Sequence, residues 1–188
     1  MSSGTTATIG IFSNDKCHLL NCGDSRACLY SSNGDLKSRT IDHRPDSITE
    51  MERLTVGGFP PPVCTAGGNA RINVPLKDGT WQYAISRSLE GAPECLKSGI
   101  ISSPTIHTHV GVQKSDFLVV ATDGIWDVFD NETAGLFVAN MLSEKILTVD
   151  EICERLCGEA KRLGSQDNCS AVILLPDFLV RFNFVANF

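Results

Sequence analysis

The sequence FLVVATDGIWDV, residues 117–128, is the stretch that decides the fold. It opens with the uncharged apolar run FLVVA, which is typical of a strand buried on at least one face. Asp123 follows this run and precedes Gly124, so we expect its carboxylate to emerge at the end of the buried strand. Carboxylates on short turns at strand ends are the hard oxygen ligands that Mg²⁺ and Mn²⁺ prefer.

Two further acidic residues stand at similar places. Asp167 lies in GSQDN, between the end of a predicted helix and the start of the last predicted strand, and Asp24 lies in NCGDSRA at a turn between two strands. Taken singly, each has a structural interpretation, because aspartate side chains bond nearby backbone amides in turns. Asp127 and Asp130 are interpreted in that way.

Apolar runs separated by turn residues predict three or four antiparallel strands at the beginning of the chain. The first pair flanks Asn14 and Asp15, and the next pair flanks Asn33-Gly34, a dipeptide that favours a tight hairpin turn. The four predicted strands are 5–13, 18–22, 26–31 and 36–40.

Helices are predicted mainly in the second half. Thr148 and Glu151 form a capping box before an apolar stripe that ends at Gly164. Helices are expected at 48–54, 133–143 and 148–163, further strands at 81–85, 116–121 and 170–175, and irregular structure at 60–73 and 91–103. The pattern predicts one domain of the α+β class, because antiparallel strands come first and helices late.

Seven segments, taken in order, resemble the motifs of the metal-dependent serine/threonine protein phosphatases of the 2C type. ATDGIWD and GSQDN are the most specific of them. The segments are SGTTA (3–7), NCGDSRA (21–27), DHRPD (42–46), ERL followed by GG (52–58), ISRSL (85–89), FLVVATDGIWDV (117–128) and GSQDNCSAVIL (164–174).

The resemblance implies a four-layer αββα sandwich, in which helices flank two antiparallel sheets, and a centre of two Mn²⁺ or Mg²⁺ ions. A water bridging the ions would attack the phosphorus of phosphoserine or phosphothreonine in a protein substrate. By motif position Asp123 and Asp167 would be metal ligands, and Asn168 would support them. Asp24 would help to hold a third ion together with Asp123. Arg87 would lie in the flap near the substrate, with a structural role.

The sequence departs from the family at its beginning. It lacks the phosphate-binding arginine, the acidic pair and the DGHG segment whose aspartate bridges the metals, and SGTTA begins at the third residue. We therefore expect residues 1–188 to be a partial catalytic domain, without the N-terminal part and with impaired hydrolysis. A non-catalytic pseudophosphatase that acts as an interaction module is the alternative.

Histidines could also carry chemistry. His43 lies in a polar turn, where it could serve as an acid or as a hydrogen-bonded structural group. His107 and His109 would share one face of a strand but have no third metal ligand nearby.

Composition narrows the partners and the location. Sixteen Lys and Arg against 22 Asp and Glu give a net charge of −6, which argues against nucleic acid. The sequence has no apolar run of the length of a membrane helix, so we expect no membrane partner, and we expect a monomer. The eight cysteines include no CxxC pair, so reduced thiols and a cytoplasmic or nuclear location are expected rather than zinc or disulfides.

Overall fold

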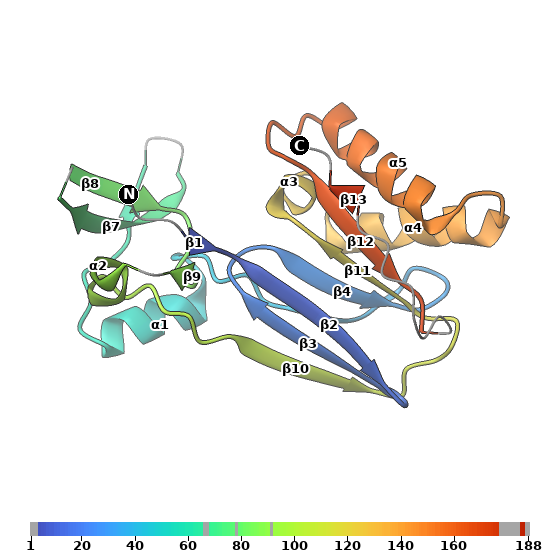
Figure 1. Cartoon of the computed structure of the whole chain (residues 1–188), viewed down its shortest axis with the longest axis horizontal. Coiled ribbons are helices and arrows are strands. Elements are labelled where there is room, and N and C mark those ends of the chain that lie inside the picture. The colour runs from blue at the N-terminus through green and yellow to red at the C-terminus, as the bar shows by residue number, and fades with distance from the viewer. Residues whose placement is uncertain (1–3, 66–67, 78, 91, 177–184, 187–188) are drawn as a thin grey trace. The chain divides into compact units, whose positions relative to one another are not determined.

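The computed structural model of the chain divides into two compact units (Figure 1). It describes residues 4–65, 68–77, 79–90, 92–176 and 185–186. Unit 1 comprises Met1–Ala7, Asn21–Asp24 and Ile41–Thr105, and unit 2 comprises Thr8–Leu20, Ser25–Thr40 and Ile106–Phe188.

A five-stranded antiparallel sheet is the centre of unit 2. Its middle strand is the FLVVA run, whose first three side chains are completely buried, as expected for a strand covered on both faces. The strand order is β13-β12-β11-β4-β5, with β4 at Arg26–Tyr30, β5 at Leu36–Arg39, β11 at Phe117–Ala121, β12 at Ser170–Leu174 and β13 at Val185–Ala186.

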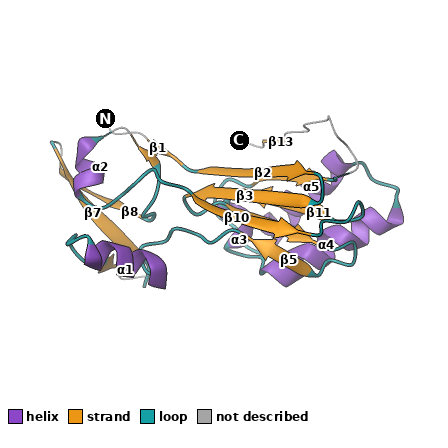
Figure 2. Ribbon diagram, turned by 90° about the horizontal axis from the view of Figure 1, so that it is seen from below, coloured by secondary structure: helices purple, strands orange, loops and turns teal. Residues whose placement is uncertain are grey.

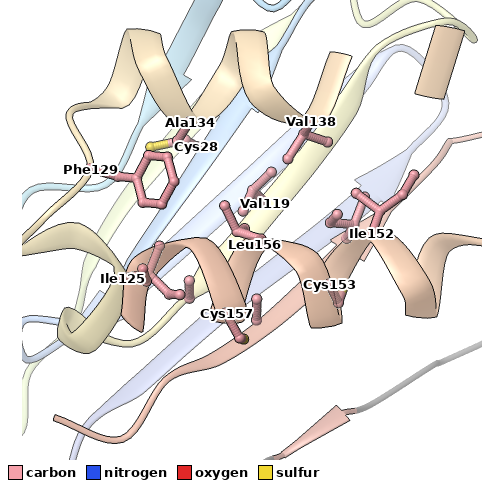
Figure 3. Packing of buried hydrophobic residues seen from close by; sticks show 14 of the residues in the cluster. Cys28, Val119, Ile125, Phe129, Ala134, Val138, Ile152, Cys153, Leu156 and Cys157 are labelled. Carbon is pink, nitrogen blue, oxygen red and sulfur yellow. The ribbon is translucent and has the colours of Figure 1, made fainter. Parts of the chain in front are cut away.

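Two long helices pack against one face of this sheet, α4 at Asn131–Glu144 and α5 at Val149–Arg162. Asp130 caps α4 by accepting the Thr133 N–H, and Thr148 with Glu151 forms the expected capping box of α5. Figure 3 shows Leu156 of α5 and Val138 of α4 beside Val119 of β11, and Ile152 belongs to the same core.

A second antiparallel sheet packs against the other face of the five-stranded sheet (Figure 2). Its order is β10-β3-β2, with β2 at Ala7–Ser13, β3 at Lys16–Cys22 and β10 at Thr105–Val110. Leu19 of β3 and Leu118 of β11 belong to the small core between the two sheets. This layering of helices and two antiparallel sheets confirms the predicted α+β class.

Unit 1 has its own core. Leu54 of α1 (Ile48–Val56) packs in it with Ile72 and Val74 of β7 (Ala70–Leu76) and with Cys95 of α2 (Pro93–Lys97). The remaining elements of unit 1 are β6 at Val63–Cys64 and β8 at Gly79–Tyr83, which both pair with β7, and the pair of β1 at Gly4–Thr5 with β9 at Leu89–Glu90.

Two expectations for unit 1 were wrong. The predicted loop at 60–73 contains β6 and the first half of β7, and the predicted irregular segment at 91–103 contains α2. Alternate side chains of β7 are buried against residues distant in sequence, and the local pattern of residues 60–73 carries no sign of that packing. In α2 the proline stands in the first turn, where its missing N–H leaves no helical bond unmade.

Burial in the apolar cores accounts for most of the cysteines. No disulfide joins the cysteines, and seven of the eight are buried, where they act as small apolar groups. Among the helices that the structure describes, none has both the length and the hydropathy needed to cross a lipid bilayer.

Candidate functional site

Asp123 lies where the central strand of unit 2 ends. It is the first residue of α3, the four-residue helix Asp123–Trp126 that follows β11 directly. The indole N–H of Trp126 donates to the carbonyl of Ala121 at 2.9 Å, which ties this helix back to the strand. Asp123 is half-buried, and the strand end and the buried indole fix its backbone.

Asp167 lies in the loop between α5 and β12. Gly164 ends the helix with a φ of 101°, a conformation that glycine adopts without strain. The Lys161 ammonium donates to the main-chain carbonyl of Asp167, and the Asp167 carboxylate accepts the Asn168 N–H at 2.7 Å. The side chain of Asp167 is exposed, so the loop is held by its backbone and presents a carboxylate to solvent.

The two loops adjoin, because β11 and β12 are paired strands with Ala121 opposite Ala171. Thr122 links them: its hydroxyl lies 3.2 Å from the carbonyl of Asn168 and accepts the Ser170 N–H at 3.1 Å. A Cβ on Gly124 would lie only 2.3 Å from the same Asn168 carbonyl, so the contact requires glycine. The structure thus brings the segments of Asp123 and Asp167 together at the end of the strand pair β11–β12.

A pocket of about 510 Å³ opens beside the end of this strand pair. Asp127 and Asp167 place two carboxylates in its wall. The lining residues are Gly124, Asp127, Val128, Gly164, Ser165, Gln166 and Asp167. Carboxylates in the wall of an open pocket are oxygen donors that suit a hydrated cation.

The donor chemistry fits Mn²⁺ or Mg²⁺, because carboxylate oxygens on rigid turns are the preferred ligands of hard cations. Within the described ranges, however, no three His, Cys, Asp or Glu side chains form a metal-binding group. The roles of Asp123 and Asp167 as metal ligands therefore stay predictions, and by themselves they would supply only part of a ligand set. Asp24, buried in its turn, belongs to unit 1, and its pairing with Asp123 stays a prediction. Asn168 contributes its backbone carbonyl to the loop contact, and its residue is exposed.

Arg87 is part of a buried ion cluster in unit 1. Its Nε and Nη2 donate to one carboxylate oxygen of Glu50 at 3.0 and 2.6 Å, and Arg53 donates to the other oxygen at 3.0 and 2.8 Å. The third guanidinium nitrogen of Arg87 donates to the carbonyl of Ser103 at 2.9 Å. Every nitrogen of this guanidinium therefore has a protein acceptor, and its role as a flap residue stays a prediction.

Glu50 was not identified from the sequence as a functional residue. It is completely buried, and burial alone would raise its pKa, but hydrogen bonds from Arg87, Arg53 and Ser86 lower the pKa to about 2. The sequence does contain a signal, because Glu50 and Leu54 stand four residues apart on one face of α1, and both are buried.

A family profile and several known proteins match the chain in sequence. The profile of the family described as Protein phosphatase 2C matches residues 1–169. "Probable protein phosphatase 2C 69" of Arabidopsis thaliana is 31% identical over 177 residues, which cover 92% of this chain and 44% of that protein. "Protein phosphatase 1B" of Bos taurus is 31% identical over 172 residues, covering 92% and 34%. The chain thus spans less than half the length of these relatives.

Solved structures show the same fold. The crystal structure of serine-threonine phosphatase 2C from Toxoplasma gondii superposes with a TM-score of 0.71 at 21% identity, over 90% of this chain and 57% of that one. Together with the family profile, which covers most of the sequence, the fold leads to one assignment: the chain belongs to the protein phosphatase 2C family.

Proposed function

We propose that residues 1–188 are part of a catalytic domain that hydrolyses phosphoserine and phosphothreonine in proteins with the help of Mn²⁺ or Mg²⁺. The observation that carries this proposal is the contact between the loops of Asp123 and Asp167 at the paired ends of β11 and β12. Family membership supports the reaction class, since the named relatives are protein phosphatases.

Asp123 and Asp167 would hold the metal, and the chain's other residues would keep these two carboxylates in place. The hydroxyl of Thr122 joins the two loops, and the Lys161 ammonium holds the backbone of the second loop. When bound, Mn²⁺ or Mg²⁺ would lower the pKa of a coordinated water and neutralise the charge that develops on the phosphoryl oxygens. Neither carboxylate needs to act as a nucleophile in such a reaction.

The second candidate is a non-catalytic interaction module that has kept the fold. The observation that favours it is the ligand count: the described residues contain no metal-binding group of three or more side chains. A Mn²⁺ or Mg²⁺ ion held by two carboxylates keeps most of its waters and binds weakly. For the 188-residue chain by itself we therefore propose weak metal binding and slow hydrolysis.

Calorimetric titration with Mn²⁺ tests this proposal, alongside a phosphopeptide assay with Mn²⁺, with Mg²⁺ and with a chelator. Asp123→Asn and Asp167→Asn should each weaken Mn²⁺ binding by more than about tenfold, since mutation of even an outer-shell partner typically lowers metal affinity by about 10–100-fold. Glu154→Gln, an exposed carboxylate on α5, is the control and should bind as the wild type does. Equal binding by all three variants would contradict the proposed site. Mn²⁺ binding without any hydrolysis would favour the interaction module.

A further inference from the structure

His43 bonds both backbone polar groups of the residue that precedes Asp24. The Gly23 N–H donates to His43 Nδ1 at 3.1 Å, and the Gly23 carbonyl accepts the His43 N–H at 2.8 Å. The side-chain amide of Asn21 donates to the same carbonyl at 2.9 Å. Gly23 has a φ of 121°, which favours glycine. The backbone that carries Asp24 is therefore fixed from two directions within unit 1.

These bonds define the state of the His43 ring. Because Nδ1 accepts a hydrogen bond, it carries no proton, and we assign the proton to Nε2, which lies 3.2 Å from the hydroxyl of Thr105. Burial and then the positive charge of Arg87 lower the pKa of His43 to about 4, although the carboxylates of Glu50 and Asp42 act in the opposite direction. The ring is neutral at pH 7 and keeps its acceptor.

The buried ion cluster holds His43 in turn. The His43 carbonyl accepts the Ser86 N–H at 2.8 Å and lies 2.9 Å from the Ser86 hydroxyl. The same hydroxyl lies 2.8 Å from Glu50, whose carboxylate binds Arg53 and Arg87. A continuous series of bonds thus runs from the cluster through Ser86 and His43 to the turn of Asp24.

We propose that His43 is a positioning residue: through the amide of Gly23, its Nδ1 sets the direction in which the Asp24 carboxylate leaves the turn. The inference rests on the proposed function and on the prediction, made from the family motif, that Asp24 is a further metal ligand. His43 itself donates no proton to a leaving group, because its ring is buried and its one ring proton faces Thr105.

Two substitutions separate the acceptor from the volume of the ring. His43→Asn places an amide oxygen near the position of Nδ1 and can accept the Gly23 N–H, whereas His43→Leu fills a similar volume without an acceptor. Thr105→Val removes only the partner of Nε2 and is the matched control. The readouts are the exchange rate of the Gly23 amide and the chemical shifts of Gly23 and Asp24, measured by NMR on the ¹⁵N-labelled 188-residue chain.

The leucine variant should speed exchange of the Gly23 amide by roughly tenfold, as expected for the loss of one buried hydrogen bond. The asparagine variant should restore slow exchange, and Thr105→Val should leave both residues' signals close to those of the wild type. Unchanged Gly23 and Asp24 signals in the leucine variant would overturn the inference, and so would equal effects of leucine and asparagine. If the leucine variant does not fold, the wild-type chain decides through the ¹⁵N–¹⁵N coupling between the Gly23 amide and His43 Nδ1. A measurable coupling supports the hydrogen bond, and its absence overturns the inference.

Adding Mn²⁺ to the same samples separates this inference from the proposed function. In the wild type, Mn²⁺ should broaden the Asp24 amide signal; the leucine variant should weaken the broadening, and the asparagine variant should restore it. A wild-type Asp24 signal that Mn²⁺ leaves sharp would contradict the metal role of Asp24. If the Gly23 amide still followed the acceptor pattern, the positioning by His43 would stand.

Discussion

Replacement of Glu50 by glutamine tests whether the buried ion cluster stabilises unit 1. Glutamine keeps the shape of the side chain but removes its charge and sets an NH₂ group against an arginine N–H. Removal of one partner of a buried ion pair costs about 3–5 kcal/mol, because the remaining charge stays buried without its counter-ion. The side chains of Arg53 and Arg87 are 21% and 13% exposed, so we expect the lower end of this range, about 3 kcal/mol.

The same carboxylate makes stability depend on pH. The pKa of Glu50 is lowered from 4.5 in a free side chain to about 2 in the fold. The unfolded chain therefore takes up this proton first as the pH falls. The stabilisation is complete above about pH 4.5 and is lost between about pH 4.5 and pH 2. At about 1.4 kcal/mol for each pH unit between the two values, the contribution is roughly 3 kcal/mol, in agreement with the cost of the substitution.

Urea unfolding at pH 7 and pH 3.5 measures this effect, and hydrogen exchange followed by mass spectrometry assigns it to unit 1. Glu50→Gln should lower the free energy of unfolding by about 3 kcal/mol at pH 7, and the difference should narrow by roughly 1 kcal/mol at pH 3.5. Glu52→Gln, an exposed neighbour on α1, should stay within about 0.5 kcal/mol of the wild type. Wild-type stability in Glu50→Gln, or an equal loss in Glu52→Gln, would show that the buried ion cluster does not stabilise unit 1.

Three further predictions follow from other contacts. The pKa of His43 is lowered from 6.5 to about 4, so the unfolded chain binds this proton first as the pH falls. The free energy of unfolding should therefore fall by up to roughly 3 kcal/mol between pH 6.5 and pH 4. Urea unfolding measured at several pH values should show this slope in the wild type and not in His43→Asn. Gly124→Ala should destabilise the fold by roughly 1–3 kcal/mol and weaken Mn²⁺ binding, since the new Cβ meets the Asn168 carbonyl. The control Gly158→Ala on α5, where a Cβ meets nothing within 4 Å, should change neither the stability nor the Mn²⁺ affinity in this way. Equal Mn²⁺ affinity in the two alanine variants would argue against the loop contact. Thr148→Ala removes the side-chain cap of α5 and should lower the Tm by about 2–4 °C for a loss of about 1 kcal/mol; an unchanged Tm in differential scanning calorimetry would contradict the role of the cap.

Local patterns were enough to predict much of unit 2. The strand β11 and the capped helix α5 follow from an apolar run and a capping box, and both depend on residues that are close in sequence. Unit 1 was harder to predict, because β7 and α2 are short and their burial comes from residues distant in sequence. The metal-ligand candidates could be named from their motifs, and the contact between their loops follows from the pairing of β11 with β12.

The bonds that support these candidates could not be read from the sequence. Glu50 and Arg87 are 37 positions apart, and Gly23 and His43 are 20 positions apart. No local period links such pairs, and one of the two bonds uses a backbone amide that any residue except proline would supply. Only the fold shows that the two arginines share one buried carboxylate.

Anomalous X-ray diffraction from Mn²⁺-soaked crystals tests whether Asp123 and Asp167 hold a metal ion together. We expect an anomalous difference peak in contact with oxygens of both carboxylates, and loss of that peak in crystals of Asp123→Asn. A peak that contacts neither residue, or one that remains unchanged in the asparagine variant, would show that these two carboxylates do not form the metal site.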